Sequence, residues 1–111
     1  MSYYAKHKGS ITAKDCAEAS YLGKKIEEEL TAEQYHKGET LVIDLEGRAD
    51  YNEDTLHEIF ADLTPYTVEG EVFFWGEDDA VWRYIFRDGE WFEECGEIVY
   101  KDGYSLSGSS N

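Results

Sequence analysis

The sequence predicts a two-layer α+β domain in which two helices cover one face of a mostly antiparallel sheet. Two segments, 19–30 and 56–63, place apolar residues three or four positions apart, as amphipathic helices do. After Pro65 the period changes to two, and three successive runs alternate in the manner of half-buried strands. The order β-α-β-α-β-β-β fits helices on one face of a sheet. We expect a ferredoxin-like, split β-α-β topology or a similar one, extended by the last hairpin.

The first predicted strand and helix occupy the N-terminal third. Residues 2–11 predict a strand, which Lys6 and Lys8 make amphipathic or an edge strand. Thr12 resembles a helix N-cap because Asp15 follows three residues later. The apolar stripe of the helix that follows is Ala19, Leu22, Ile26 and Leu30. Gly23 lies inside this helix and allows a break there.

The middle of the chain predicts a short turn, a strand and a second helix. Thr31 with Gln34 would open one helical turn that ends at Gly38, and residues 40–46 predict a strand. Asn52 is a good N-cap for the second helix, which Pro65 ends. Tyr51 would pack against Leu56 as a hydrophobic staple. The residues expected in the core from the first 65 positions are Leu22, Ile26, Leu41, Ile43, Leu56, Ile59, Phe60 and Leu63.

Three alternating runs, 67–75, 80–87 and 90–100, predict an antiparallel meander. Its turns are residues 76–79 and the Asp88-Gly89 pair, a strong hairpin signal. The face richest in large apolar groups should face the helices: Val72, Phe74, Trp82, Tyr84 and Phe86. Residues 1–101 are therefore expected to form one domain, and residues 102–111 a frayed polar tail.

The net charge of −15 is the most informative feature for function. Acids and lysines balance over residues 1–30, so the whole imbalance falls on residues 31–111. Such a field repels nucleic acid and acidic membranes and attracts basic surfaces. Arg83, Arg87 and Trp75 could begin a base-stacking platform, but pairing of the arginines with Glu71 or Glu93 is the simpler role.

The sequence therefore predicts a non-enzymatic module that binds a basic partner protein, with mimicry of nucleic acid as its most specific form. A solvated surface that only keeps the protein soluble is the plainer interpretation. The expected contact residues combine acids with exposed aromatics: Glu71, Phe73, Trp75, Glu77, Asp78, Asp79 and Glu93.

No motif indicates a reaction, a cofactor or a metal. The nucleophile-elbow, zinc-protease, P-loop and dinucleotide-binding patterns are absent from the sequence. His7, His36 and His57 share no metal-ligand spacing, and His57 is expected to be exposed. The pattern of a calcium-binding EF-hand loop begins at Asp50 but is incomplete. Its sixth position should be Gly and is Thr55, and its twelfth should be Glu and is Ala61.

The remaining expectations concern the cell compartment, the two cysteines and an alternative function. The N-terminus lacks an apolar run typical of secretion and no segment is long enough to span a membrane, so a cytoplasmic protein is expected. Cys16 and Cys95 are expected as small, at least half-buried apolar residues rather than a disulfide. The alternative function is a small-molecule-binding or catalytic domain, with a pocket between sheet and helices near His57, Cys95 or Trp82.

The segment from Gly76 to Ile98 carries a resemblance to a known group. Its Gly-Glu-Asp-Asp turn, the Trp82-Arg83-Tyr84 run with Phe86, and the Asp88-Gly89 pair resemble small acidic proteins of gut bacteria and their phages. The Tyr-Tyr start and Pro65-Tyr66 recur in that group as well. The resemblance implies a phage or mobile-element setting and carries over no activity.

Overall fold

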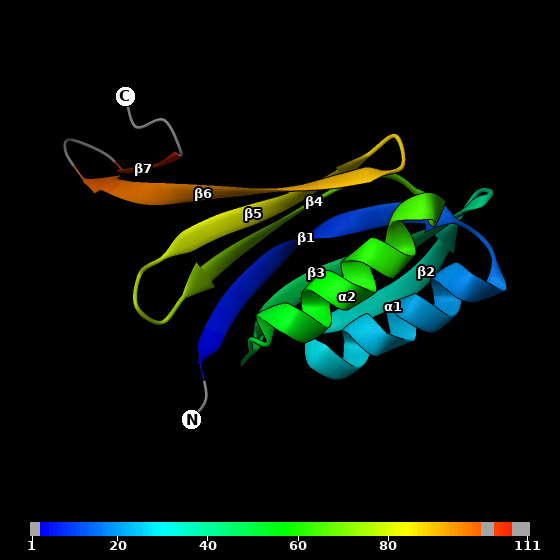
Figure 1. Ribbon diagram of the computed structural model, residues 1–111, viewed down its shortest axis with the longest axis horizontal. Coiled ribbons are helices and arrows are strands. Elements are labelled where there is room, and N and C mark those ends of the chain that lie inside the picture. The colour runs from blue at the N-terminus through cyan, green and yellow to red at the C-terminus, as the bar shows by residue number, and fades with distance from the viewer. Residues whose placement is uncertain (1–2, 101–103, 108–111) are drawn as a thin grey trace.

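The computed structural model describes residues 3–100 and 104–107 of the chain. Figure 1 shows the elements in order along the chain. They are β1 (Tyr4–Lys14), α1 (Ala17–Glu29), β2 (Ala32–Lys37), β3 (Thr40–Asp50), α2 (Glu53–Leu63), a 3₁₀ turn (Thr64–Tyr66), β4 (Thr67–Gly76), β5 (Val81–Arg87), β6 (Glu90–Tyr100) and β7 (Tyr104–Ser107).

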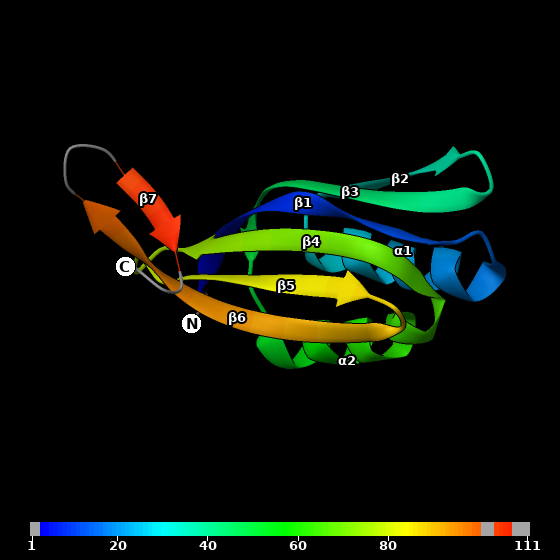
Figure 2. The same ribbon diagram turned by 90° about the horizontal axis from the view of Figure 1, so that it is seen from above.

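The strands form one sheet in the order β2-β3-β1-β4-β5-β6-β7, and neighbouring strands are antiparallel. The sheet is strongly curved, and both helices pack into its concave side, as Figure 1 and the turned view of Figure 2 show. The predicted α+β class and the two-layer arrangement are confirmed. The opposite, uncovered side of the sheet is called the open face below.

The first strand differs from its prediction in place and extent. β1 is amphipathic, as one alternative predicted, but it pairs with β3 on one side and β4 on the other, so it is not an edge strand. It also continues to Lys14, and Thr12 pairs with Val42 inside it instead of capping a helix. The N-cap of α1 is Cys16, which makes no side-chain cap hydrogen bond. Strand pairing on both sides therefore overrides the local capping pattern.

The short helical turn predicted at Thr31 is wrong, because residues 32–37 form the edge strand β2. Gln34 pairs with Ile43, and its side-chain amide donates to the carbonyl of Ser20 in α1 at 3.2 Å. The helix is unbroken at Gly23, where a Cβ would lie 2.6 Å from the Gln34 side chain. Gly23 thus lets the edge strand pack closely against the helix.

The second helix agrees with its prediction. The side chain of Asn52 accepts a hydrogen bond from the backbone N–H of Thr55 at 3.2 Å, which satisfies one free donor of the first turn. Pro65 lies in the 3₁₀ turn that follows the helix. The hydroxyl of Thr64 donates to the carbonyl of Phe60 at 2.7 Å and so satisfies a carbonyl of the last turn.

The meander and the core are also confirmed. All eight core residues predicted from the first 65 positions are buried, and so are Val72, Phe74, Tyr84 and Phe86 of the meander, whereas Trp82 is half-buried. Phe73 and Trp75 point the other way and are 41% and 44% exposed on the open face. The core therefore lies between the concave side of the sheet and the apolar stripes of the two helices.

The C-terminal segment can be compared with its prediction only in part. Within the tail expected to be frayed, Tyr104–Ser107 pair with β6 as β7. The remaining tail residues, 102, 103 and 108–111, lie outside the described part of the chain. Among the described residues, no helix is both long and apolar enough to cross a membrane.

Candidate functional site

Four of the exposed aromatic rings on the open face each lie next to a cation. The Nζ of Lys6 lies 6.0 Å from the ring centre of Trp75, and the guanidinium carbon of Arg83 lies 5.7 Å from that of Phe73. Two more such pairs join Arg48 to Tyr4 at 4.8 Å and Arg87 to Phe92 at 5.6 Å. Positive charge therefore accompanies Tyr4, Phe73, Trp75 and Phe92 on this face.

Charges of both signs are nearly balanced on this face. The strand registers place seven of the ten lysines and arginines there: Lys6, Lys8, Lys14, Lys37, Arg48, Arg83 and Arg87. Eight carboxylates share it: Glu33, Asp44, Glu46, Asp50, Glu69, Glu71, Glu90 and Glu94. The excess of negative charge consequently lies elsewhere on the molecule.

Much of that excess lies on the helices. α2 exposes Glu53, Asp54, Glu58 and Asp62 and contains no lysine or arginine. α1 carries four glutamates, Glu18 and Glu27 to Glu29, against only two lysines. The charges of residues 1–30 sum to zero only because Lys6, Lys8 and Lys14 are counted together with α1. These three lysines lie on β1 and point to the open face, away from the helices. The helix layer is therefore the acidic side of the protein.

The expected contact residues do not form one surface. Glu71 pairs with the guanidinium of Arg83, which also binds Glu94 at 2.7 Å through Nε, rather than the predicted Glu93. In the turn after β4, the carboxylate of Glu77 accepts from the backbone N–H of Tyr4 at 3.0 Å, and that of Asp78 from the hydroxyl of Tyr3 at 2.5 Å.

These contacts change the roles of the turn acids. Through these hydrogen bonds, Glu77 and Asp78 hold the start of β1 against the β4–β5 turn. Asp79 adopts a positive φ of 67° and accepts from the indole N–H of Trp75 at 3.4 Å. Of the seven residues, only Phe73 and Trp75 present an exposed apolar surface. Four of the five acids, all except Glu93, contact partners on or beside the open face.

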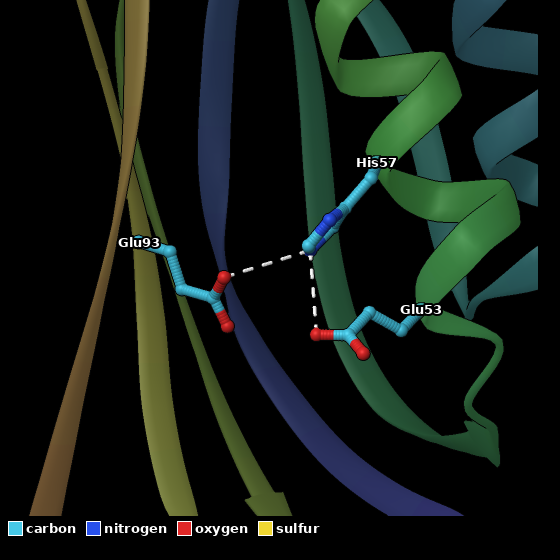
Figure 3. A group of neighbouring side chains, drawn as sticks. All are labelled: Glu53, His57 and Glu93. Carbon is cyan, nitrogen blue, oxygen red and sulfur yellow. Dashed lines mark ion pairs between the residues drawn. The ribbon is translucent and has the colours of Figure 1, made fainter.

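Glu93 lies on the opposite side of the sheet, because it pairs with the buried Tyr84. There it meets two residues of α2, as Figure 3 shows. The Nε2 atom of His57 lies 3.6 Å from a carboxylate oxygen of Glu93 and 3.7 Å from one of Glu53. The sequence predicted no metal site, yet these three residues bring potential ligand atoms within 4.8 Å of one another.

His57 is half-buried, so its predicted exposure is wrong. Its ring packs edge-on against Tyr84 and Trp91, with ring centres 5.6 and 5.1 Å apart. Its Nε2 atom lies 3.0 Å from the hydroxyl oxygen of Tyr84, which is itself hydrogen-bonded to the hydroxyl of Tyr51. The i, i+4 spacing of Glu53 and His57 was the one sequence signal for this cluster.

The buried tyrosines predict a loss of stability at high pH. Burial raises the pKa of Tyr51 to about 12 and also raises the pKa of Tyr84. Since both pKa values exceed the ordinary value near 10, the unfolded chain loses these protons first. The free energy of unfolding should be unaffected by these groups below pH 10 and should fall as the pH rises from about 10 to about 12.

Urea unfolding followed by circular dichroism across that pH range measures this loss. Each tyrosine contributes at most about 1.4 kcal/mol per pH unit. Tyr51→Phe removes one titrating group, so the slope should become shallower. Tyr21→Phe, at a residue 60% exposed, is the matched control and should leave the slope unchanged. An equal slope in all three proteins would contradict the assignment.

The structure also describes a shallow hollow of about 470 Å³ on the open face. Its lining includes Lys6, Lys8, Arg48, Phe73 and Trp75, which come from β1, β3 and β4. The alternative function required a pocket between sheet and helices, and this hollow lies on the other side of the sheet.

Cys16 is half-buried and Cys95 is exposed, and both are free thiols, so the expected burial of Cys95 is wrong.

Comparisons with known protein families, with curated proteins and with solved structures find no match to this chain.

Proposed function

We propose that this protein is a non-enzymatic interaction module that binds a basic partner protein through α2. The observation that carries the proposal is a row of exposed carboxylates, Asp54, Glu58 and Asp62, on one side of the helix. Their spacing of four residues places them about 6 Å apart along the helix axis. Within the described part of the chain, none of the three has a hydrogen-bond or ion-pair partner.

Unpaired surface charges of one sign act at a distance on an incoming partner. They raise the association rate and select partners of the opposite sign. The cations of the open face lie on the side of the sheet turned away from the helices, so they do not cover this row. Exposed charges are screened over about 8 Å at physiological ionic strength, so the row acts mainly on a partner that approaches the helix layer.

The most specific form of the proposal is mimicry of a nucleic-acid backbone, which also presents a regular row of negative charges. The partner would then be a basic enzyme or protein that binds nucleic acid. The phage or mobile-element setting implied by the sequence resemblance is part of the proposal, and so is the ferredoxin-like topology. The order β2-β3-β1-β4, with α1 after β1 and α2 after β3, supports a split β-α-β core that β5 to β7 extend.

The test compares two variants with equal charge changes. One neutralises the row by Asp54→Asn, Glu58→Gln and Asp62→Asn. The matched control neutralises three exposed carboxylates of the open face by Glu33→Gln, Asp44→Asn and Glu46→Gln. Each immobilised protein is incubated with host lysate at low and at high salt, and the recovered proteins are identified.

The row variant should lose most of a basic protein that the wild type recovers at low salt, whereas the control variant should retain it. High salt should release that protein from the wild type. Recovery of no basic protein at low salt, or binding indifferent to salt, would overturn the proposal. Equal losses of the basic protein in both variants would show that binding depends on the net charge of the whole protein rather than on this row. That result would contradict binding through α2.

A second candidate is binding of a small anionic molecule in the hollow of the open face. Three cations and two exposed aromatic rings around that hollow favour it. In the experiment above, this function would leave the acidic row without effect, so the outcome distinguishes the two candidates.

A further inference from the structure

We propose that Glu53, His57 and Glu93 form a binding site for one divalent transition-metal ion of the zinc type. The three ligand atoms converge at the junction of α2 and β6 and point toward one another in Figure 3. The site is separate from the acidic row of α2 and does not depend on it. Neither its residues nor its chemistry enters the proposed protein interaction.

The distances between ligand atoms agree with those around a small ion. Zinc binds histidine nitrogen at about 2.0–2.1 Å and carboxylate oxygen at about 2.0–2.2 Å. Ligand atoms at tetrahedral angles are then roughly 3.3–3.6 Å apart. The His57 Nε2 atom lies 3.6 Å from Glu93 and 3.7 Å from Glu53. The two carboxylates lie within 4.8 Å of each other, so rotation of the glutamate side chains must bring them closer to complete the site.

The chemistry of the ligand set selects the kind of ion. One imidazole with two carboxylates suits zinc and the neighbouring first-row dications, whereas calcium and magnesium prefer oxygen ligands alone. Two carboxylates also neutralise the charge of a dication.

The surrounding structure holds the ligands in place before an ion arrives. Glu53 and His57 are one helical turn apart, directly after the Asn52 cap. The imidazole ring packs against Trp91 and Tyr84, so its orientation is constrained. Glu93 is fixed by its register opposite Tyr84.

The hydroxyl of Tyr84 is a second feature directed at this point. The residue is fully buried, but its oxygen lies 3.0 Å from the same Nε2 atom and is supported by the hydroxyl of Tyr51. An ion at Nε2 would displace this hydrogen bond, and the freed hydroxyl would then lie where it can hydrogen-bond a metal-bound water molecule or a ligating carboxylate. Polar groups around a metal in this way position its ligands and tune its affinity.

Ion pairing alone would explain the same distances if His57 were protonated between the two carboxylates, so the test must measure metal binding. The full chain, freed of metal by chelation, is titrated with zinc chloride in a calorimeter at pH 7. Cobalt(II) is titrated in parallel, and its visible absorption reports tetrahedral ligation. One ion per chain should bind, with a dissociation constant on the order of 1 µM or tighter.

Two single variants test ligands of the site, and a third serves as the control. His57→Gln and Glu93→Gln should each weaken zinc binding by about 10–100-fold or more and reduce the cobalt absorption. His36→Gln is the matched control, because His36 also pairs with a carboxylate, Asp15, at 3.2 Å but has only that one acidic partner among the described residues. It should bind zinc as the wild type does. Far-ultraviolet circular dichroism establishes that each variant is folded.

The proposal is overturned if the wild type binds zinc no more tightly than about 1 mM. It is equally overturned if folded His57→Gln or Glu93→Gln binds zinc as the wild type does. The variant that neutralises Asp54, Glu58 and Asp62 retains all three ligands, so it should still bind one ion. Failure of the metal site and failure of the protein interaction are therefore distinguishable.

Discussion

Phe60→Ala is expected to lower the free energy of unfolding by roughly 3–5 kcal/mol. Phe60 is fully buried and is the main aromatic contact between α2 and the sheet. The ring centres of Tyr84 and Phe86 lie 5.0 and 5.1 Å from its own, and that of Trp91 lies 6.1 Å away. Truncation removes apolar contacts with all three and leaves a cavity that the surrounding rings can fill only partly.

Urea unfolding monitored by circular dichroism measures this loss at constant pH and salt. Tyr21→Ala provides the control, since this aromatic residue lies on α1 and is 60% exposed. Its substitution should cost less than about 1 kcal/mol. A cost below 1 kcal/mol for Phe60→Ala would mean that the apolar stripe of α2 does not face the core.

Gly9→Ala is expected to cost about 3 kcal/mol or more, by a different mechanism. Gly9 has a φ of 155°, and an added Cβ would lie 2.0 Å from the backbone carbonyl oxygen of Glu71. A backbone atom of a paired strand cannot move aside as a flexible side chain can. The substitution should therefore force β1 and β4 apart where Gly9 pairs with Val72.

The measurement for Gly9→Ala combines urea unfolding with amide hydrogen exchange of β1 and β4. Gly38→Ala is the matched control, because Gly38 also has a positive φ, 64°, but its added Cβ would meet nothing within 4 Å. That change should cost only about 1–2 kcal/mol from the backbone conformation itself. Similar losses in the two variants would contradict the close approach of β1 and β4.

Elements specified by neighbouring residues could be predicted from the sequence. α2 has its cap, its apolar stripe and its terminating proline within 14 positions, 52–65, and the meander has alternating runs joined by short turns. β2 could not be predicted, because its polar residues 32–37 become a strand only through pairing with β3. The length of β1 was missed for the same reason, since two partner strands extend it to Lys14.

The candidate sites were harder to predict, because they depend on which face each residue occupies. A charge count along the chain assigns Lys6 and Lys8 to the same neutral segment as α1, although strand alternation places them on the open face. His57 and Glu93 are 36 positions apart and meet only because β6 passes over the start of α2. The exposure of Phe73 and Trp75, by contrast, followed directly from alternation in β4.

The central claim is that a partner recognises the acidic row of α2 rather than the aromatic open face. It is tested most directly by mapping backbone amide chemical shifts of the isotopically labelled protein, with and without the basic protein recovered at low salt. The largest changes should cluster at Asp54, Glu58 and Asp62 and disappear at high salt. Changes centred on Phe73 and Trp75, with those of α2 unaffected, would contradict the claim.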